Sequence, residues 1–209
     1  GHPDFTNVDF IFVGGSLVTD GNMNNCISLI KKRTNRPVVI FPGSPNQIDK
    51  QADGILLLSL ISGRNSDLLI GRHVESSHKL KNSNLEILST GYILVDGGRT
   101  TTVSYISNTT PIPQDKPGIA AATALAGCQL GYKLIYLDCG SGANNHASEK
   151  LIQSVRSEIN VPLIVGGGIK TQFDAEKVFK AGADIVVVGN HLEKNPYFLS
   201  ELVAAKNNC

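Results

Sequence analysis

The chain of 209 residues is 41% hydrophobic, so it is long enough to bury one sizeable core in a single globular domain. Lysine and arginine together number 19, aspartate and glutamate 18, and the charges are mixed along the chain. This balance argues against a nucleic-acid surface and against a polybasic membrane patch.

The cysteines and the apolar stretches indicate the cellular compartment of the protein. The four cysteines have no CxxC spacing, which favours reduced thiols over a zinc site or a redox pair; they are Cys26, Cys128, Cys139 and Cys209. The longest apolar stretch, GILLLSLISG, is too short to span a bilayer, and no signal-peptide pattern opens the chain. We therefore expect a soluble, cytoplasmic protein.

Short apolar runs predict seven strands. Their apolarity is continuous rather than alternating, which is typical of strands covered on both faces in a parallel sheet with helical crossovers. The runs are VDFIFVGG (8–15), PVVIFPG (37–43), GILLLSL (54–60), TGYILVDG (90–97), LIYLDCG (134–140), VPLIVGGG (161–168) and DIVVVGN (184–190).

Helical patterns fill most of the gaps between these runs. Small residues at 118–133 suit close packing on strands, and 148–159 has the apolar spacing of an amphipathic helix. At 171–182, Thr171 is a cap, Asp174 a favourable first-turn carboxylate and Gly182 a left-handed stop. The gap between 43 and 54 is too short for a crossover helix, so we expect a loop there.

The end of the chain favours a barrel over an open doubly wound sheet. No GxGxxG fingerprint is present, and (β/α)8 barrels commonly bind phosphate in the loops after strands seven and eight. Gly166–Gly168 and Gly189–Asn190 occupy those two loops. We therefore predict a modified TIM (β/α)8 barrel domain over 1–209, with phosphate-binding loops at 166–168 and 189–190. A barrel needs eight strands, so we expect the missing one to be the first, before Asp9.

Glycine allows the backbone to approach an anion closely, and a helix starting near Thr171 adds its positive end. The alternative is that these glycines only make tight turns. The pairing of the two loops favours the phosphate site over that alternative.

The segment YLDCGSGANN ends the fifth predicted run, which is strand six of a barrel whose first strand is missing, with a carboxylate, Asp138. A carboxylate at this rim can accept a hydrogen bond or a proton from a substrate hydroxyl. Strand alternation places Tyr136 on the same face. The alternative is that Asp138 caps the following turn through its own backbone.

Other polar residues near predicted strand ends are weaker candidates. Ser16 in Gly14–Ser16 could bind Mg²⁺ or diphosphate, or cap a helix. Further candidates, with a solvated helix face or an ordered loop as the alternative, are Arg64, Arg72, His73, Arg99, Asn108 and Thr109. No HExxH or GxSxG motif is present. The residues thus indicate a phosphate-binding barrel enzyme with an acidic rim residue, without naming its reaction.

Nine motifs together resemble the geranylgeranylglyceryl phosphate synthase family, which includes PcrB-type heptaprenylglyceryl phosphate synthases. They are FIFVGGS, FPGSPNQI, LLLSLISGRN, TGYILVDGG, YISNTTPIP, AATALAG, YLDCGSGA, PLIVGGGI and GADIVVVGN, and they span nearly the whole chain. The resemblance implies a modified (β/α)8 barrel without a regular third helix. It also implies Mg²⁺-dependent transfer of a polyprenyl group from its diphosphate to the primary hydroxyl of sn-glycerol 1-phosphate, which makes an ether-lipid precursor.

Site residues follow from the resemblance. The glycerol-phosphate site falls on Tyr136, Leu137, Asp138, Cys139, Gly140, Ser141, Gly142, Gly167, Gly168, Gly189 and Asn190, and Ser16 matches a Mg²⁺ position. Asp138 would deprotonate the attacking hydroxyl. The segments LISGRN and ISNTTPIP resemble a branch that favours a geranylgeranyl-length donor and forms homo-oligomers, so we expect a dimer or hexamer. A lipid product implies transient peripheral membrane contact.

One family motif has no match. Relatives end their first strand in an Asp-Pro-Asp-Lys-like motif whose aspartate binds Mg²⁺, and His2-Pro3-Asp4 follows no apolar strand. Either the sequence lacks that segment or the chain has lost it. A non-catalytic glycerol-phosphate-binding barrel therefore remains an alternative, as do a heptaprenyl-specific synthase and a sugar-phosphate isomerase.

Overall fold

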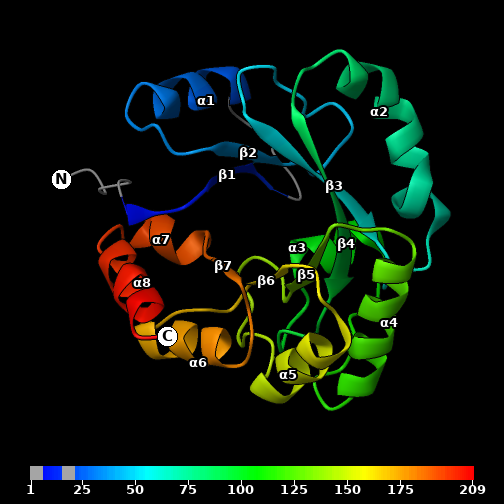
Figure 1. Ribbon diagram of the computed structural model, residues 1–209, viewed down its shortest axis with the longest axis vertical. Coiled ribbons are helices and arrows are strands. Elements are labelled where there is room, and N and C mark those ends of the chain that lie inside the picture. Colours follow the sequence, from blue (N-terminus) through cyan, green and yellow to red (C-terminus); the bar gives the residue numbers. More distant parts are fainter. Residues whose placement is uncertain (1–6, 16–21) are drawn as a thin grey trace. The chain divides into compact units, whose positions relative to one another are not determined.

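The computed structural model describes residues 7–15 and 22–209, which form two compact units (Figure 1). Unit 1 contains Leu60–Arg64 and Thr90–Cys209. Unit 2 contains Asn65–Ser89 and the described residues up to Ser59. Ser16 and the His2-Pro3-Asp4 segment lie outside the described residues. A single domain over 1–209 stays a prediction.

The strands are hydrogen-bonded neighbours in the order of the sequence, in one seven-stranded sheet within the described ranges. Pairing is parallel from β1 to β3 and again from β4 to β7. Their bounds are β1 (Ile11–Gly14), β2 (Val38–Phe41), β3 (Gly54–Leu60), β4 (Glu86–Leu94), β5 (Leu134–Asp138), β6 (Leu163–Gly166) and β7 (Ile185–Val187). All seven predicted strands are present, and the alternation of strands and helices in a modified (β/α)8 barrel is confirmed.

Helices separate most of the strands. They are α1 (Met23–Lys31), the π-helix η2 (Asp67–Gly71), α2 (Arg72–Lys81), α3 (Thr102–Ser107), α4 (Pro117–Gln129), α5 (Glu149–Glu158), α6 (Gln172–Lys180), α7 (Asn190–Lys194) and α8 (Phe198–Asn207). Residues 42–53, between β2 and β3, contain only turns and bends, so the predicted loop in place of a helix is confirmed.

Three boundaries differ from the sequence prediction. Strand β4 begins at Glu86 rather than Thr90, because the segment before Thr90 is extended although its first residues are exposed. A π-helix precedes α2, which a propensity pattern does not indicate. Strand β7 ends at Val187, and Asn190 is the first residue of α7 rather than the end of a strand.

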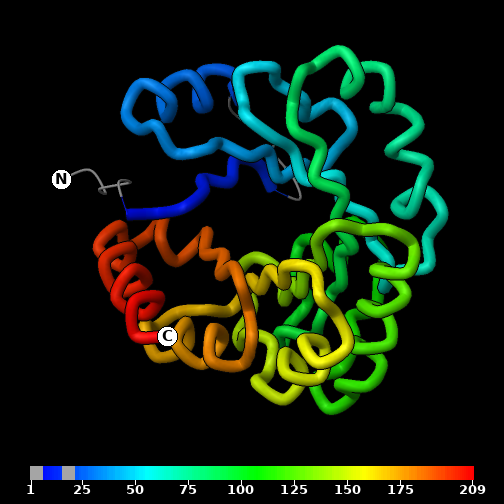
Figure 2. Tube along the Cα trace, viewed as in Figure 1, coloured from blue at the N-terminus to red at the C-terminus, as the bar shows by residue number. Residues whose placement is uncertain are grey.

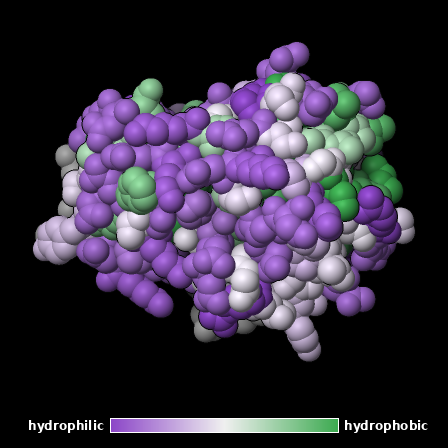
Figure 3. Space-filling view, turned by 90° about the horizontal axis from the view of Figure 1, so that it is seen from below, coloured by the Kyte–Doolittle hydropathy of each residue, from purple (hydrophilic) through white to green (hydrophobic). Residues whose placement is uncertain are grey.

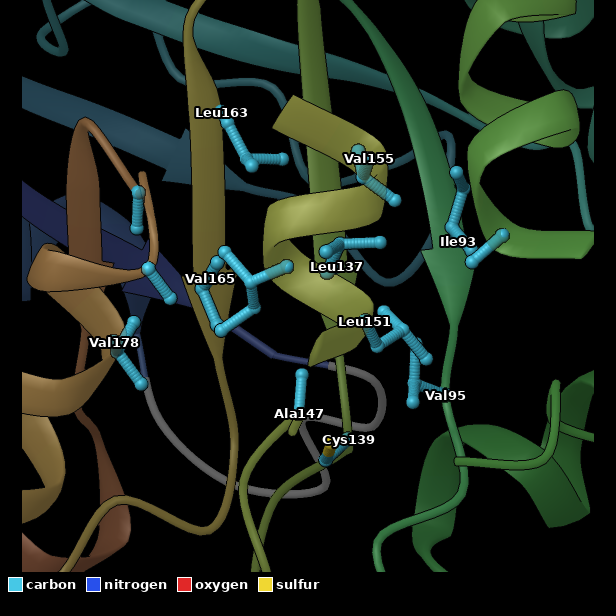
Figure 4. Close-up of a cluster of buried hydrophobic side chains, with 14 of the residues drawn as sticks. Ile93, Val95, Leu137, Cys139, Ala147, Leu151, Val155, Leu163, Val165 and Val178 are labelled. Carbon is cyan, nitrogen blue, oxygen red and sulfur yellow. The ribbon is translucent and has the colours of Figure 1, made fainter. Parts of the chain in front are cut away.

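The core of unit 1 lies between its strands and the helices that cover them. Figure 4 shows Leu151 and Val155 of α5 beside Leu137 of β5, with Val165 of β6 and Val178 of α6 next to them. All five side chains are fully buried. Within unit 1, the colours of Figure 2 pass from green at β4 through yellow to red at α8, so successive strand–helix pairs lie next to one another.

Unit 2 has a smaller core of its own. Ile27 of α1 and Leu80 of α2 are buried with Val38 and Ile40 of β2 and with Ile55 of β3. Each helix therefore covers the parallel strands with one apolar face, as expected for crossover helices.

In both units, an aspartate carboxylate links the starts of two neighbouring strands. In unit 1, Asp184 accepts hydrogen bonds from the Leu163 amide at 2.7 Å and from Arg156 at 2.9 Å. In unit 2, Asp53 accepts them from the Val38 amide at 2.8 Å and from Lys31 at 2.6 Å. In both units, the aspartate comes directly before one strand, and its carboxylate accepts a hydrogen bond from the amide of the first residue of the preceding strand. In unit 1, the Asp184 contacts fix the register at the end opposite to the predicted phosphate loops, and in unit 2 the Asp53 contacts fix it at the starts of β2 and β3.

The face drawn in Figure 3 is mainly hydrophilic, and hydrophobic residues gather toward one edge of it. Ile119 on α4 and Leu130 directly after it are among the exposed large hydrophobic residues of the chain. Within the described ranges, every helix is too short or too polar to cross a lipid bilayer.

Candidate functional site

Asp138 lies at the carboxyl end of β5 and is only 8% exposed. Its Oδ1 accepts a hydrogen bond from the Gly140 amide at 2.7 Å, and its Oδ2 accepts one from the hydroxyl of Tyr92 on β4. The Gly140 contact is the turn-capping role that the sequence left open. Because a carboxylate offers about four acceptor positions, these two contacts leave others available for a substrate hydroxyl.

Burial sets the charge state of this cluster. It raises the pKa of the Asp138 carboxyl, although the hydrogen bonds from Tyr92 and Gly140 act in the opposite direction. Burial also raises the pKa values of Tyr92, Tyr136 and the Cys139 thiol, so all three keep their protons at neutral pH. Asp138 therefore lies among neutral groups, and a raised pKa is what a proton acceptor for an alcohol needs.

Tyr136 lies on the same face of the sheet as Asp138, as strand alternation predicts. It pairs in register with Tyr92, and the two rings meet edge to face with centroids 5.4 Å apart. Sequence reasoning missed Tyr92. A tyrosine inside an otherwise apolar strand could have indicated it, because a buried tyrosine hydroxyl needs a hydrogen-bond partner.

Three of the predicted site loops meet in unit 1. The Ser141 hydroxyl donates a hydrogen bond to Asn190 Oδ1 at 2.7 Å, which joins the loop after β5 to the start of α7. The loop after β6 packs on the same place, since a Cβ at Gly167 would lie 2.7 Å from the Gly140 nitrogen. The loops after β5, β6 and β7 thus gather beside Asp138.

The glycines after β6 serve the packing of these loops. Gly168 has a φ of +74°, and a Cβ there would lie 2.2 Å from the Asn145 carbonyl oxygen. Gly167 has a φ of +81°, and its Cβ would lie 2.9 Å from Asp138 Oδ1. The tight turns proposed as the alternative are therefore real, and the same backbone approach brings the loop within reach of the carboxylate. At Gly189, by contrast, a Cβ would meet nothing within 4 Å.

The amino terminus of α6 already has an anionic partner from its own first turn. Asp174 accepts hydrogen bonds from the Lys170 and Thr171 amides, and Thr171 accepts one from the Asp174 amide. The predicted cap is confirmed, but its carboxylate occupies the positive helix end. We therefore expect a phosphate to contact the amides of Gly167–Gly168 and of Gly189–Asn190 rather than the end of α6.

Gln114 holds the long loop between β5 and α5 in place, and sequence reasoning missed it. Its Nε2 donates to the carbonyl oxygens of Asp96 at 2.7 Å and His146 at 3.1 Å. Its Oε1 accepts the Ser148 amide at 2.8 Å. The amide side chain thus ties the loop after β4 to the end of the segment that precedes α5.

The weaker candidates are mostly engaged elsewhere. Arg64 has a left-handed φ of 50° and donates to the Ser62 carbonyl, whereas Arg72 pairs with Glu75 on the exposed face of α2. His73 Nε2 is 2.7 Å from the buried Ser59 hydroxyl.

In the loop around α3, Asn108 ends the helix with a left-handed φ of 49°, and Thr109 is buried with its hydroxyl on the Ser107 carbonyl. Arg99 is exposed. Thr109 is buried in the interior, and the contacts of the other candidates are compatible with a role in binding.

No group of three or more histidine, cysteine, aspartate or glutamate side chains that could hold a metal occurs within 7–15 and 22–209. Ser16, the residue matched to Mg²⁺, lies outside these ranges.

Comparison with known proteins extends these observations. The PcrB family model matches residues 5–206. A geranylgeranylglyceryl phosphate synthase of Chitinophaga pinensis is 53% identical over 201 residues, which cover 95% of this chain and 79% of that protein. The synthase of Pyrococcus horikoshii is 43% identical over 188 residues, covering 90% of this chain and 73% of that protein.

One solved structure resembles the whole fold. It is (S)-3-O-geranylgeranylglyceryl phosphate synthase from Thermoplasma acidophilum, in complex with its substrate sn-glycerol-1-phosphate. The TM-score is 0.90 at 34% sequence identity, and the match covers 96% of this chain and 82% of that chain.

The packing of the loop after β6 gives a test of the site geometry. Gly168→Ala should lower the free energy of unfolding by more than about 1 kcal/mol, because alanine is strained at this φ and its Cβ would meet the Asn145 backbone. Gly118→Ala is the matched control, since a Cβ there meets nothing within 4 Å and alanine favours the helix α4. Urea unfolding of both variants measures the difference, and equal stabilities would contradict the described loop contact.

Proposed function

The chain belongs to the PcrB family, and we propose that it transfers a geranylgeranyl group from its diphosphate to the primary hydroxyl of sn-glycerol 1-phosphate. The products are a prenylglyceryl phosphate, which is an ether-lipid precursor, and diphosphate. Identity of 53% to the Chitinophaga pinensis synthase and the fold shared with the substrate complex from Thermoplasma acidophilum support this assignment.

The observation that carries the proposal is the position of Asp138 beside the three gathered loops. An acceptor such as sn-glycerol 1-phosphate needs a site for its phosphate and a proton acceptor for its hydroxyl. The amides of Gly167–Gly168 and Gly189–Asn190 suit the phosphate, because exposed backbone N–H groups bind anions. Asp138 suits the hydroxyl, because its two internal hydrogen bonds hold it at the rim.

The remaining proposed contacts lie around these two. The side chains of Tyr136, Ser141 and Asn190, with the backbone of Leu137, Cys139, Gly140 and Gly142, form the rest of the acceptor site. The Ser141–Asn190 hydrogen bond keeps the loops after β5 and β7 together, so both contact one ligand.

The chemical step replaces one C–O bond by another and transfers one proton. The hydroxyl oxygen bonds to C1 of the prenyl chain, the C1–O bond to diphosphate breaks with its electron pair leaving on diphosphate, and the hydroxyl proton passes to Asp138. The raised pKa of the buried carboxyl favours that transfer. Fixing the phosphate holds the hydroxyl against the carboxylate, which removes an orientation cost.

We propose Mg²⁺ as the cofactor from the chemistry of the donor. Mg²⁺ is usually held by one or two protein oxygens together with substrate phosphates, and it would neutralise charge on the departing diphosphate. Ser16 is the proposed protein ligand.

The donor and the assembly are also part of the proposal. The segments LISGRN and ISNTTPIP support a geranylgeranyl rather than a heptaprenyl donor. Exposed apolar residues such as Ile119 on α4 and Leu130 directly after it support a homo-oligomer, dimer or hexamer. The free cysteines support a cytoplasmic location. The lipid product supports transient contact with the membrane surface.

Turnover with defined substrates tests the function. With Mg²⁺ and geranylgeranyl diphosphate, sn-glycerol 1-phosphate should give a product of the mass of geranylgeranylglyceryl phosphate, and sn-glycerol 3-phosphate should not. Chelation of the metal with EDTA should stop the reaction, and added Mg²⁺ should restore it. Heptaprenyl diphosphate as the preferred donor would contradict the chain length. Binding of sn-glycerol 1-phosphate without any product would favour a non-catalytic binding barrel.

Removal of the carboxylate tests the role of Asp138. Asp138→Ala should lower kcat by about 10²- to 10⁴-fold, the usual contribution of a positioned general base. Asp115→Ala is the control, because Asp115 is exposed and pairs only with Lys116. Circular dichroism of both variants should match that of the parent. Near-normal turnover by a folded Asp138→Ala variant would rule out the proposed base.

A further inference from the structure

Tyr92 reaches Asp138 from the neighbouring strand. The two residues come from β4 and β5, and they are 5% and 8% exposed. The Tyr92 hydroxyl donates to Asp138 Oδ2, while Oδ1 accepts the Gly140 amide. The carboxylate is thereby held on both oxygens, once by a side chain and once by the backbone.

Among the described residues, no cation lowers the pKa of Asp138; the groups that lower it are the Tyr92 hydroxyl and the Gly140 amide. The titratable groups around Asp138 are Tyr92 on β4, Tyr136 on β5 and Cys139 directly after β5, and the loop after β6 contributes Gly167. All three side chains are neutral at pH 7, because burial raises their pKa values. A buried carboxylate without a counter-ion depends on hydrogen-bond donors to remain ionised. The Gly140 amide is a fixed part of the turn, which leaves Tyr92 as the side-chain donor.

The geometry of Tyr92 is itself constrained. Its ring packs edge to face on Tyr136, with an interplanar angle of 82°. Tyr92 pairs in register with Tyr136, two residues before Asp138, so the phenol spans the distance from the ring contact to the carboxylate. Packing therefore holds the hydroxyl at Oδ2.

We propose that Tyr92 is a positioning residue for the transfer reaction, which directs the free lone pairs of Asp138 toward the acceptor hydroxyl and keeps the carboxylate ionised. This inference rests on the proposed function, in which Asp138 accepts the hydroxyl proton. Tyr92 acts only through Asp138 and needs no contact with either substrate.

The test is the pH dependence of kcat/KM in Tyr92→Phe. Loss of a donor to the charged form raises the pKa of Asp138, so the acid limb of the profile should move to higher pH. At neutral pH, kcat should fall about tenfold or more, the loss expected for one hydrogen bond to a charged group. The KM for sn-glycerol 1-phosphate should stay within about twofold, since one hydroxyl that does not touch the ligand is removed.

Tyr197→Phe is the matched control, because it deletes the same hydroxyl from a side chain that is 77% exposed. Its profile should overlay that of the parent. A purely structural role for Tyr92 would lower the melting temperature and leave the acid limb in place, and that result would overturn the proposal.

A second readout separates this inference from the proposed function. Carboxyl ¹³C NMR of protein labelled at aspartate, with the signal assigned by Asp138→Asn, follows the titration of Asp138 without turnover. An upward shift in Tyr92→Phe supports the proposed contact even if the parent makes no product, in which case the proposed function fails instead. An unchanged titration overturns the role of Tyr92 whatever the activity.

A variant with 3-fluorotyrosine at position 92 covers the case in which Tyr92→Phe does not fold. The fluorinated phenol is the stronger donor, so it should move both the acid limb and the NMR titration to lower pH. A shift to higher pH, or none, would contradict the proposal.

Discussion

The carboxyl of Asp138 is buried at the end of β5, and its hydrogen bonds with the Tyr92 hydroxyl and the Gly140 amide connect β4, β5 and the turn after β5. A buried charge of this kind is tolerated only where donors surround it. One donor is the Gly140 amide, which requires the turn after β5, and the other is Tyr92, which requires the register between β4 and β5. The loop after β6 can approach the same carboxylate because Gly167 has no Cβ.

A few further contacts between loops complete the proposed site. Ser141 and Asn190 join the loop after β5 to the start of α7, and Gln114 holds the segment that leads into α5. The amides proposed for the phosphate and the carboxylate proposed for the hydroxyl then belong to one connected set of loops. Within unit 1, the carboxylate of Asp184 fixes the start of β6 at the opposite end of the strands, so different residues set the strand register and form the proposed site.

The sequence predicted the features that depend on local pattern. Continuous apolar runs gave all seven strands, and Thr171, Asp174 and Gly182 predicted the two ends of α6, because caps involve neighbouring residues. Contacts between distant residues were missed. Gln114 and His146 are 32 positions apart in the sequence and Tyr92 and Asp138 are 46 apart, and neither contact can be predicted from the spacing of residues along the chain. The start of α7 was read as strand, since the apolar run continues almost to Gly189.

The most direct test of the account is a crystal structure of the protein with sn-glycerol 1-phosphate. The account predicts that the phosphate accepts hydrogen bonds from the amides of Gly167–Gly168 and Gly189–Asn190. It also predicts that the primary hydroxyl lies within hydrogen-bond distance of Asp138, with Tyr92 still on Oδ2. A phosphate bound away from these loops, or a hydroxyl that does not reach Asp138, would contradict the proposed site.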